Sequence, residues 1–351
     1  MKKVFVALSG GVDSSVVAHR LLTEGWDVTA VFIRVWQPEF LPCSQDDEER
    51  AAMRVAAFLG IPFKRLDLSE EYKRDVVDTM IAEYTKGRTP NPDVLCNASI
   101  KFGAFLAFAK SHGADKIATG HHAQVRETGA GIFELLRGAD PLKDQAYFLW
   151  QLTQEELAYT LMPIGNLTKA QVRSYAEKHK LPSARKADSQ GLCFIGDVDM
   201  KTFLKHFITT KPGDVLDTNG IVIGAHDGAE LVTIGQRGGF TVTKKGASDV
   251  ALYVVSKDTE NNTITVAPRG SVSVYAHSTV PLVSTNWMHT PEGNRSYTCE
   301  IRYHGTPMPC TVVLGNSQTA EIHFTDPIAV APGQSVVVYD NLRCMGGGIV
   351  A

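Results

Sequence analysis

The sequence lacks any long hydrophobic run. Although 44% of its 351 residues are hydrophobic, no apolar stretch approaches the roughly 18 residues that a membrane-spanning helix needs. The N-terminal apolar run, Val4–Leu8, is too short for the core of a signal peptide and is typical of a buried first strand. These absences predict a protein with no membrane partner that works in the cytoplasm.

Cysteine is also scarce, and none of the six cysteines forms a Cys-x-x-Cys pair with another. They are Cys43, Cys96, Cys193, Cys299, Cys310 and Cys344. Their spacing matches neither a disulfide framework nor a zinc site, so we expect no resident metal. In a reducing cytoplasm they are expected to be thiols unless chemistry uses them.

An excess of positive charge is missing too, because the net charge is −3. This excludes an indiscriminate coat for nucleic acid but not a local basic face. Six lysines and arginines against two acidic residues give a local charge of +4 between Gly165 and Gln190. Taken alone, this run is most simply a solvated helix face, whereas next to a reactive loop it favours phosphate contacts.

Short apolar runs alternate with helical patterns in the first part of the chain. Strands are expected at residues 3–8, 28–32 and 116–119, and helices at 14–24, 46–59 and 100–111. This alternation predicts an α/β fold with a parallel sheet and helices on both faces. Further on, Thr153-x-x-Glu156 and Thr168-x-x-Gln171 fit capping boxes and predict a purely helical stretch.

Helical patterns end near Lys211, and short β runs separated by Gly, Pro and Asn turns follow. Examples are 252–255, 263–266 and 335–339. We expect a catalytic domain with a helical extension at 1–205, a small β-rich central domain at 206–269 and a C-terminal β-barrel at 270–351.

A glycine-rich segment, Ser9-Gly10-Gly11-Val12-Asp13-Ser14-Ser15, joins the first strand to the first helix. Its glycines allow a tight turn whose N–H groups face an anion, and the helix N-terminus adds partial positive charge. The segment has no lysine and is not a Walker loop. It resembles the loop of N-type ATP pyrophosphatases, a class that includes synthetases, amidotransferases and tRNA-modifying enzymes.

Two cysteines lie in segments that favour chemistry. Cys96 ends the run Thr89-Pro90-Asn91-Pro92-Asp93-Val94-Leu95-Cys96, in which two prolines predict a stiff extended segment before a helix. A thiol near a helix N-terminus would have its thiolate favoured. Cys193 lies between Gly191 and Gly196, in an expected loop. For each cysteine, simple packing in the core is the alternative.

Several motifs in a fixed order resemble the MnmA family of bacterial tRNA-specific 2-thiouridylases. The phosphate loop and the two cysteine segments, with Ser189-Gln190-Gly191-Leu192-Cys193-Phe194-Ile195-Gly196 for the second, are three of them. The others are Lys101-Phe102, Thr119-Gly120-His121, Lys143-Asp144-Gln145-Ala146-Tyr147-Phe148-Leu149, Thr233-Ile234-Gly235-Gln236-Arg237, Ala331-Pro332-Gly333-Gln334 and Gly346-Gly347-Gly348-Ile349. The resemblance therefore covers essentially the whole chain.

This resemblance implies a first domain like the adenine nucleotide alpha hydrolases, which binds ATP together with Mg²⁺ carried by the ATP. The implied ATP contacts follow the phosphate loop and add two single positions. They are Ala7, Leu8, Ser9, Gly10, Gly11, Val12, Asp13, Ser14, Ile33 and Gly120.

The resemblance further implies that Cys96 is the nucleophile and that Cys193 carries sulfur as a persulfide. Asp93, three residues before Cys96, is the best candidate for moving protons. The implied contacts with the target base are Asn91, Pro92 and Asp93. Those with the rest of the tRNA are His121, Lys143, Asp144, Gln145, Arg302, Tyr303 and Gln334.

The implied reaction is ATP-dependent 2-thiolation of the wobble uridine in lysine, glutamate and glutamine tRNAs. A persulfide sulfur-carrier protein or a cysteine desulfurase would supply the sulfur. His122 and Gln124 stand where the family usually has an aromatic residue and an arginine, so one tRNA contact is expected to differ. Cys43 has no implied catalytic role, and Cys299, Cys310 and Cys344 are expected to be structural thiols.

Two other functions are compatible with parts of the sequence. A ligase or amidotransferase acting on a small molecule would share the phosphate loop but need neither cysteine. A tRNA-binding β module fused to a nucleotide-sensing domain would need no catalysis. The absence of any Cys-x-x-Cys disfavours an iron–sulfur tRNA thiolase.

Overall fold

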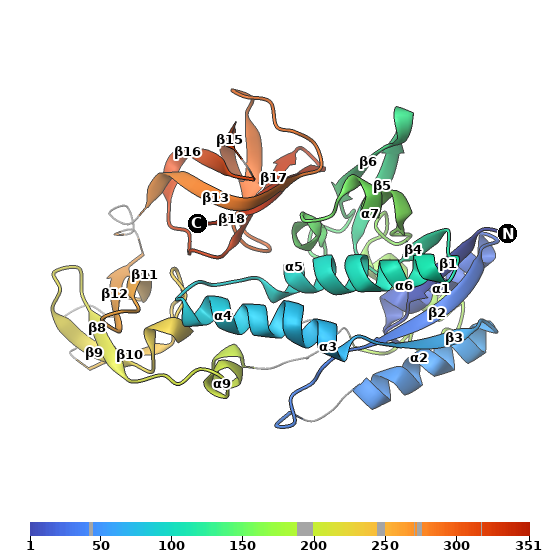
Figure 1. The fold of residues 1–351 in the computed structure, drawn as a ribbon, viewed down its shortest axis with the longest axis horizontal. Coiled ribbons are helices and arrows are strands. Elements are labelled where there is room, and N and C mark those ends of the chain that lie inside the picture. Colours follow the sequence, from blue (N-terminus) through green and yellow to red (C-terminus); the bar gives the residue numbers. More distant parts are fainter. Residues whose placement is uncertain (42–44, 188–198, 244–249, 270, 272–275, 317) are drawn as a thin grey trace.

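The computed structural model describes residues 1–41, 45–187, 199–243, 250–269, 271, 276–316 and 318–351 (Figure 1). Cys43 and Cys193 lie outside these residues. Figure 1 shows an α/β part near the N-terminus, a small β part, and a β-barrel that ends the chain.

A five-stranded parallel sheet forms the first part and confirms the predicted α/β fold. Val4 and Val6 pack on one side of β1 and Phe5 on the other, so both faces of the sheet are covered. The two-residue strand β7 interrupts a stretch that we expected to be purely helical. In spatial order the strands are β3 (Phe63–Asp67), β2 (Asp27–Arg34), β1 (Lys3–Ala7), β4 (Lys116–Ala118) and β7 (Thr160–Leu161).

One face of this sheet packs against three helices, and the other face against two long helical rods. The three helices are α1 (Val12–Thr23), α2 (Gln45–Leu59) and α8 (Lys169–Lys178). Each rod is α-helical at its ends and π-helical in its middle. The first runs through α3 (Ser69–Tyr72), η1 (Lys73–Asp78) and α4 (Thr79–Thr85), and the second through α5 (Pro92–Cys96), η2 (Asn97–Ala104) and α6 (Phe105–Ser111).

Helix α5 begins earlier than the sequence predicted. Asn91 accepts hydrogen bonds from the backbone N–H groups of Asp93 and Val94, and Pro92 occupies the first helical turn, where its missing N–H costs nothing. Asp93 and Cys96 therefore lie on the helix itself, and the expectation of an extended segment up to Cys96 was wrong.

Both predicted capping boxes are present at the starts of short helices. Thr153 caps α7 (Gln154–Tyr159) and Thr168 caps α8. In each case the threonine backbone N–H donates in return to the side-chain oxygen of Glu156 or Gln171. Helix α9 (Met200–Lys205) follows near the end of the helical part. No helix among the described residues is long and apolar enough to cross a membrane.

The small β part is one five-stranded sheet around a core that includes Val215, Val254 and Ile264. Its strands are, in order, β10 (Phe240–Val242), β9 (Val222–His226), β8 (Gly213–Leu216), β12 (Thr263–Pro268) and β11 (Leu252–Asp258).

Six antiparallel strands close into the C-terminal barrel, because β13 pairs with both β16 and β18. They are β13 (His277–Trp287), β16 (Ala320–Ile328), β15 (Met308–Leu314), β14 (Tyr297–Glu300), β17 (Ser335–Asp340) and β18 (Arg343–Val350). A hairpin from the α/β part, β5 (Ala123–Thr128) and β6 (Ile132–Arg137), extends this sheet by pairing with β18. The hairpin fixes the barrel against the catalytic part.

Candidate active site

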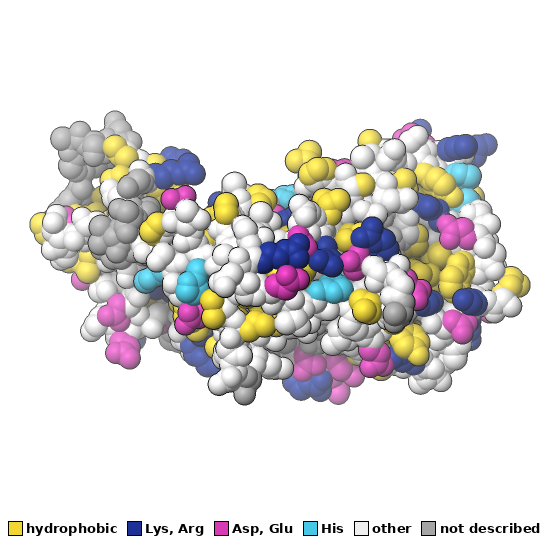
Figure 2. All heavy atoms as spheres, turned by 90° about the horizontal axis from the view of Figure 1, so that it is seen from above, with side chains coloured by type: hydrophobic (Ala, Val, Ile, Leu, Met, Phe, Trp, Pro, Cys, Tyr) yellow, Lys and Arg dark blue, Asp and Glu magenta, His cyan; other side chains and the backbone are white. Residues whose placement is uncertain are grey.

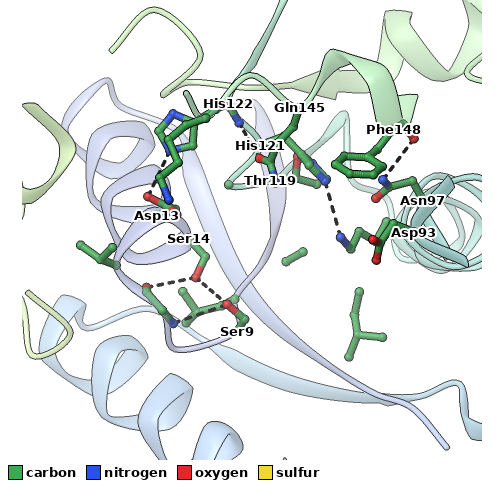
Figure 3. A pocket seen from close by; sticks show the side chains of 18 of the residues that line it. Ser9, Asp13, Ser14, Asp93, Asn97, Thr119, His121, His122, Gln145 and Phe148 are labelled. Carbon is green, nitrogen blue, oxygen red and sulfur yellow. Dashed lines mark hydrogen bonds and ion pairs between the residues drawn. The ribbon is translucent and has the colours of Figure 1, made fainter. Parts of the chain in front are cut away.

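A cavity of about 580 Å³ lies where strands β1, β2 and β4 end. Ligands of open α/β folds bind at this carboxyl edge. Helix α5 and the barrel loop between β14 and β15 complete its wall. Figure 3 shows Ser9, Asp13 and Ser14 on one side of the cavity and Asp93, Asn97 and Phe148 on the other. One cavity thus joins the phosphate loop to the segment around Cys96.

The phosphate loop needs glycine at one position in particular. Gly10 has φ of +72°, and a Cβ there would lie 2.7 Å from the backbone nitrogen of Ala52 and 2.9 Å from the carbonyl oxygen of Glu48 in α2. The loop therefore packs directly on that helix. Ser14 and Ser15 donate to the carbonyl oxygen of Gly11, at 3.3 and 2.7 Å. This bonding fixes the start of α1, whose N-terminal N–H groups suit an anion.

Asp13 is the most strongly bound side chain of the loop. Lys169, at the start of α8, donates to both of its carboxylate oxygens at 2.8 and 2.7 Å, and Nε2 of His122 lies 3.4 Å from one of them. Burial alone would raise the pKa of Asp13, but the hydrogen bond from His122 and the charge of Lys169 outweigh it and hold this pKa below its usual value. Asp13 is accordingly an anion at neutral pH.

A second polar chain follows strand β4. His121 is buried, its Nδ1 lies 2.8 Å from the Thr119 hydroxyl, and its Nε2 lies 3.5 Å from Nζ of Lys101. Burial, with the nearby charge of Lys101, keeps the pKa of His121 well below 6.5, so this ring is neutral at pH 7. A lysine ammonium only donates, so Nε2 accepts and Nδ1–H donates to Thr119. Contact between His121 and tRNA stays a prediction.

Gly120 brings β4 and the phosphate loop together. A Cβ on Gly120 would lie 3.0 Å from the backbone nitrogen of Ser14 and 3.1 Å from Cβ of Asp13. The backbone after β4 therefore forms a close side wall for the loop, next to Ile33 at the end of β2.

Asp93 of α5 and Asn97, the residue that follows this helix, line the cavity, whereas Cys96 is fully buried and does not line it. Asn97 donates to the carbonyl oxygen of Phe148 at 3.2 Å, while its own buried side-chain oxygen has no partner among the described residues. The π-helical segment η2 begins at Asn97, and such segments are frequent at functional sites. A nucleophilic Cys96 would need a local change in this helix to reach the cavity.

Aromatic rings from the barrel and from the loop before α7 meet at the cavity. The ring of Tyr303 lies 4.3 Å from that of Phe148 and stacks on His304 at 3.9 Å, measured between centroids. Burial, with the charges of Asp144 and Asp93, raises the pKa of Tyr303 to about 12, so its hydroxyl stays protonated. Arg302, beside this cluster, is exposed and does not line the cavity.

Two residues of the segment Lys143–Gln145 line the cavity, and the third holds neighbouring segments in place. Lys143 and Gln145 line the cavity, and Gln145 accepts from the backbone N–H of His122 at 2.9 Å. Asp144 is buried and accepts from the N–H groups of Gly138 and Ala146 and from Arg137. The contact of Asp144 with tRNA stays a prediction, since these bonds engage both of its oxygens.

Arg137 joins two segments of the expected RNA interface. Its guanidinium pairs with Asp144 and with Glu300 at 2.9 Å each, and it stacks on the Tyr339 ring at 3.6 Å. Glu300 ends β14, just before Arg302 and Tyr303. A partly buried cation thus joins the end of β14, just before the barrel loop, to the segment Lys143–Gln145.

Gln334 lies outside the cavity, in a barrel loop that docks on the segment leading to α5. Thr89 donates its N–H to the carbonyl oxygen of Pro332 at 2.8 Å, and its hydroxyl lies 3.2 Å from that of Thr233 in the small β part. All three parts of the chain therefore meet just before Asn91.

Most of the predicted site residues meet in the cavity. Those that line it are Ala7, Leu8, Ser9, Gly11, Val12, Asp13, Ser14, Ile33, Asp93, Gly120, His121, Lys143, Gln145 and Tyr303. Those that do not are Gly10, Asn91, Pro92, Cys96, Asp144, Arg302 and Gln334. The expected relay between Cys96 and Cys193 stays a prediction, because Cys193 lies outside the described residues.

Sequence reasoning gave no site role to several residues of the cavity wall. They are Asn97, Lys101, Thr119, His122, Phe148, Lys169 and His304. Most stand inside quoted motifs, which was the available signal. Lys169 belongs to the basic stretch for which a solvated face and phosphate contacts were both considered, and its ammonium pairs with Asp13. Similarly, Arg173 donates to the carbonyl oxygen of Lys186 at 3.2 Å.

The surface charge agrees with this inward use of cations. On the face seen in Figure 2, lysine and arginine side chains lie among acidic ones and form no continuous basic patch. Contacts with phosphate are therefore expected from individual cations near the cavity.

Comparisons with known proteins cover all three parts of the chain. Residues 2–197 match the tRNA methyl transferase HUP domain, residues 201–268 the tRNA methyl transferase PRC-barrel domain, and residues 278–350 the aminomethyltransferase beta-barrel domain.

Full-length relatives carry one shared name, tRNA-specific 2-thiouridylase MnmA. The protein from Francisella philomiragia is 40% identical over 99% of both chains. That from Nitrosomonas europaea is 41% identical over 99% of this chain and 98% of its own. That from Listeria innocua is 43% identical over 99% of this chain and 94% of its own.

Proposed function

This chain belongs to the family of tRNA-specific 2-thiouridylases, and we propose that it replaces the C2 oxygen of the wobble uridine in tRNA with sulfur, using ATP. The observation that carries the proposal is the single cavity in which a phosphate loop faces Asp93 on the helix of Cys96. Oxygen at C2 is a poor leaving group, so its adenylation by ATP must precede the entry of sulfur.

ATP fits the phosphate-loop end of the cavity. The N–H groups at the start of α1 and the hydroxyls of Ser9 and Ser14 would hold phosphates, and Gly120 leaves the room that a side chain would fill. Lys169 lies close enough to share its charge between Asp13 and a phosphate. Adenylation by ATP would supply the AMP leaving group.

Mg²⁺ is expected to arrive with the ATP. Asp13, Glu48 and Asp93 are the carboxylates that line the cavity, and both oxygens of Asp13 already bind Lys169. No cluster of three potential metal ligands occurs in the part of the chain that the structure describes. The chain itself would therefore offer a magnesium ion little beyond Asp13 and would leave most ligands to phosphates and water.

Sulfur would arrive as a persulfide on Cys193, delivered by a sulfur-carrier protein or a cysteine desulfurase. Attack of the Cys96 thiolate on the inner sulfur would release the terminal sulfur as sulfide and form a Cys96–Cys193 disulfide. Alternatively, the terminal sulfur would attack C2 directly before Cys96 forms the same disulfide. In either route AMP leaves, and a dithiol reductant supplies two electrons to restore the cysteines. Asp93 would move the protons.

A ligase or amidotransferase acting on a small molecule is the alternative that the phosphate loop alone would allow. The barrel loop argues for RNA, because Tyr303 and His304 bring stacking surfaces to the same cavity. We also expect the enzyme to act in the cytoplasm, together with its tRNA.

Mass spectrometry of the nucleosides of lysine, glutamate and glutamine tRNAs tests the proposal after incubation with ATP and a persulfide donor. We expect 2-thiouridine only when ATP is present. Release of pyrophosphate that does not depend on tRNA, with no 2-thiouridine formed, would instead support the small-molecule ligase.

A further inference from the structure

Leu142 is the most exposed large apolar side chain in the described chain apart from Met1. Its exposed fraction is 78%, compared with 61% for Leu342 and 54% for Ile221. Single exposed apolar residues are common on proteins and need no explanation by themselves. Leu142 differs from the others because it lines the cavity that holds the phosphate loop and Asp93.

The turn that carries Leu142 is held firmly in place. Asp140 accepts the N–H of Leu142 at 3.0 Å on one carboxylate oxygen and the N–H of Lys169 at 2.9 Å on the other, and its carbonyl accepts the N–H of Lys143 at 3.0 Å. Pro141 restricts the backbone between them. The leucine is therefore presented to solvent by a rigid scaffold.

The same scaffold is anchored to the ATP site. Asp140 bonds to Lys169, the residue that binds Asp13. Three residues after Leu142, Gln145 exchanges two hydrogen bonds with the backbone of His122, at 2.9 and 3.0 Å. The position of Leu142 relative to the cavity is thus set by the elements that set the phosphate loop.

A base that reacts inside a cavity must leave its stack, and proteins often support such distortions with an inserted apolar side chain. The flipped base has aromatic partners ready in Tyr303, His304 and Phe148. The gap that it leaves in the RNA stack can be filled by an exposed apolar side chain at the edge of the cavity, beside a cation for the neighbouring phosphate. Leu142 and Lys143 supply this pair on adjacent residues.

We propose that Leu142 is a wedge that packs against the base next to the target uridine and fills the place from which that uridine is flipped. This inference rests on the proposed function and adds a residue that positions the substrate. It makes the turn Asp140–Lys143 the element that couples opening of the RNA stack to the ATP site.

Two RNAs distinguish stacking of Leu142 on the neighbouring base from a general contact of Leu142 with RNA. One is a synthetic hairpin with the target uridine in its loop, and the other is the same hairpin without the base on the 3′ side of that uridine. Fluorescence anisotropy gives the Kd of each RNA for the wild type, Leu142→Ala, Leu142→Met and Ile221→Ala. ATP-dependent pyrophosphate release is measured with the intact hairpin.

We expect Leu142→Ala to weaken binding of the intact hairpin on the order of tenfold and to leave binding of the hairpin without the neighbouring base unchanged, since no stacking partner remains for the wedge. Leu142→Met and Ile221→Ala should bind both RNAs as the wild type does. Equal binding of the intact hairpin by wild type and Leu142→Ala would overturn the wedge. So would an equal loss on both RNAs, which would mark Leu142 as a general contact. A wild type that releases no pyrophosphate with the intact hairpin would overturn the proposed function and the inference with it.

Discussion

At the nucleotide end of the cavity one continuous segment, Ser9–Ser15, supplies backbone N–H and hydroxyl groups, and hydrogen bonds within the segment and to Lys169 hold it in place. At the base end, groups come from helix α5, from the segment Lys143–Gln145 and from the barrel loop, and Cys96, the proposed nucleophile, is buried. The nucleotide end is thus preorganised, whereas the base end is assembled from distant segments. An enzyme built in this way is expected to accept ATP readily and to complete its thiolation site only on RNA.

Removal of the Asp13 carboxylate is the strongest test of the preorganised nucleotide end. Asp13→Ala should lower RNA-dependent pyrophosphate release, and with it thiolation, on the order of a hundred- to a thousandfold. The ion pair between Lys169 and Asp13 would be lost, and the loop would lose its fixed anion. Pyrophosphate release is measured together with the unfolding temperature.

Asp326→Ala, on the exposed face of the barrel, is the matched control and should behave as the wild type does. Wild-type rates in Asp13→Ala would remove the phosphate-loop assignment.

Lys169 tests whether the nucleotide end depends on one cation that lines the cavity. Lys169→Met should weaken ATP binding by about ten- to a hundredfold, the usual range for charge-assisted hydrogen bonds, because Asp13 would then repel the phosphates. RNA binding without ATP should hardly change. Calorimetric titration with ATP and anisotropy with tRNA give the two affinities.

Lys169→Arg should recover most of the ATP affinity, and Lys178→Met, on the exposed end of the same helix, should have no effect. A similar loss of affinity for ATP and for tRNA in Lys169→Met would show that the nucleotide end and the base end do not bind their ligands independently.

Arg302 tests the base end with a smaller expected effect. Arg302→Ala should weaken tRNA binding severalfold and reduce the salt dependence of the Kd by about one phosphate contact, while ATP binding stays unchanged. The measurement is anisotropy over a range of salt concentrations, with Arg74→Ala as the control. An unchanged affinity and salt slope would remove Arg302 from the interface.

His121 tests the stability of the protein rather than the binding of a ligand. Its pKa in the folded protein lies well below the 6.5 of the unfolded chain, so below pH 6.5 the unfolded chain binds more protons. The free energy of unfolding should therefore fall with falling pH below 6.5, by up to about 1.4 kcal/mol per pH unit from this group. His121→Gln should remove this part of the slope, as measured by urea denaturation.

His277→Gln, at an exposed position, is the control and should keep the wild-type slope. An identical slope in His121→Gln and the wild type would contradict the buried, neutral state of His121.

The sequence was most informative where the structure is local. Strands β1, β2 and β4, both capping boxes and the strand–loop–helix placement of Ser9–Ser15 depend on neighbouring residues, and local patterns predicted them. Strands β3 and β7 and the hairpin β5–β6 were not predicted. The helical rod 69–85 was missed although Tyr72, Val76, Met80 and Tyr84 recur every four residues and are buried. That signal was present and unused.

Contacts between distant segments were not predictable in the same way. The hairpin β5–β6 has its outer partner in β18, near the end of the chain. Nothing near Lys169 in the sequence indicates that it reaches Asp13, since that contact depends on how α8 packs on α1. The base end of the cavity consists largely of such contacts, so local patterns could not predict how its segments come together.

The central claim is that the nucleotide end can work without a complete base end, and Cys96→Ser tests it most directly. Pyrophosphate release and 2-thiouridine are measured in the same reaction with tRNA, ATP and a persulfide donor. The account predicts that this variant still releases pyrophosphate in a first, RNA-dependent turnover but forms no 2-thiouridine, while Cys310→Ser, a buried barrel thiol, forms it normally if folded. Formation of 2-thiouridine by Cys96→Ser would contradict the account.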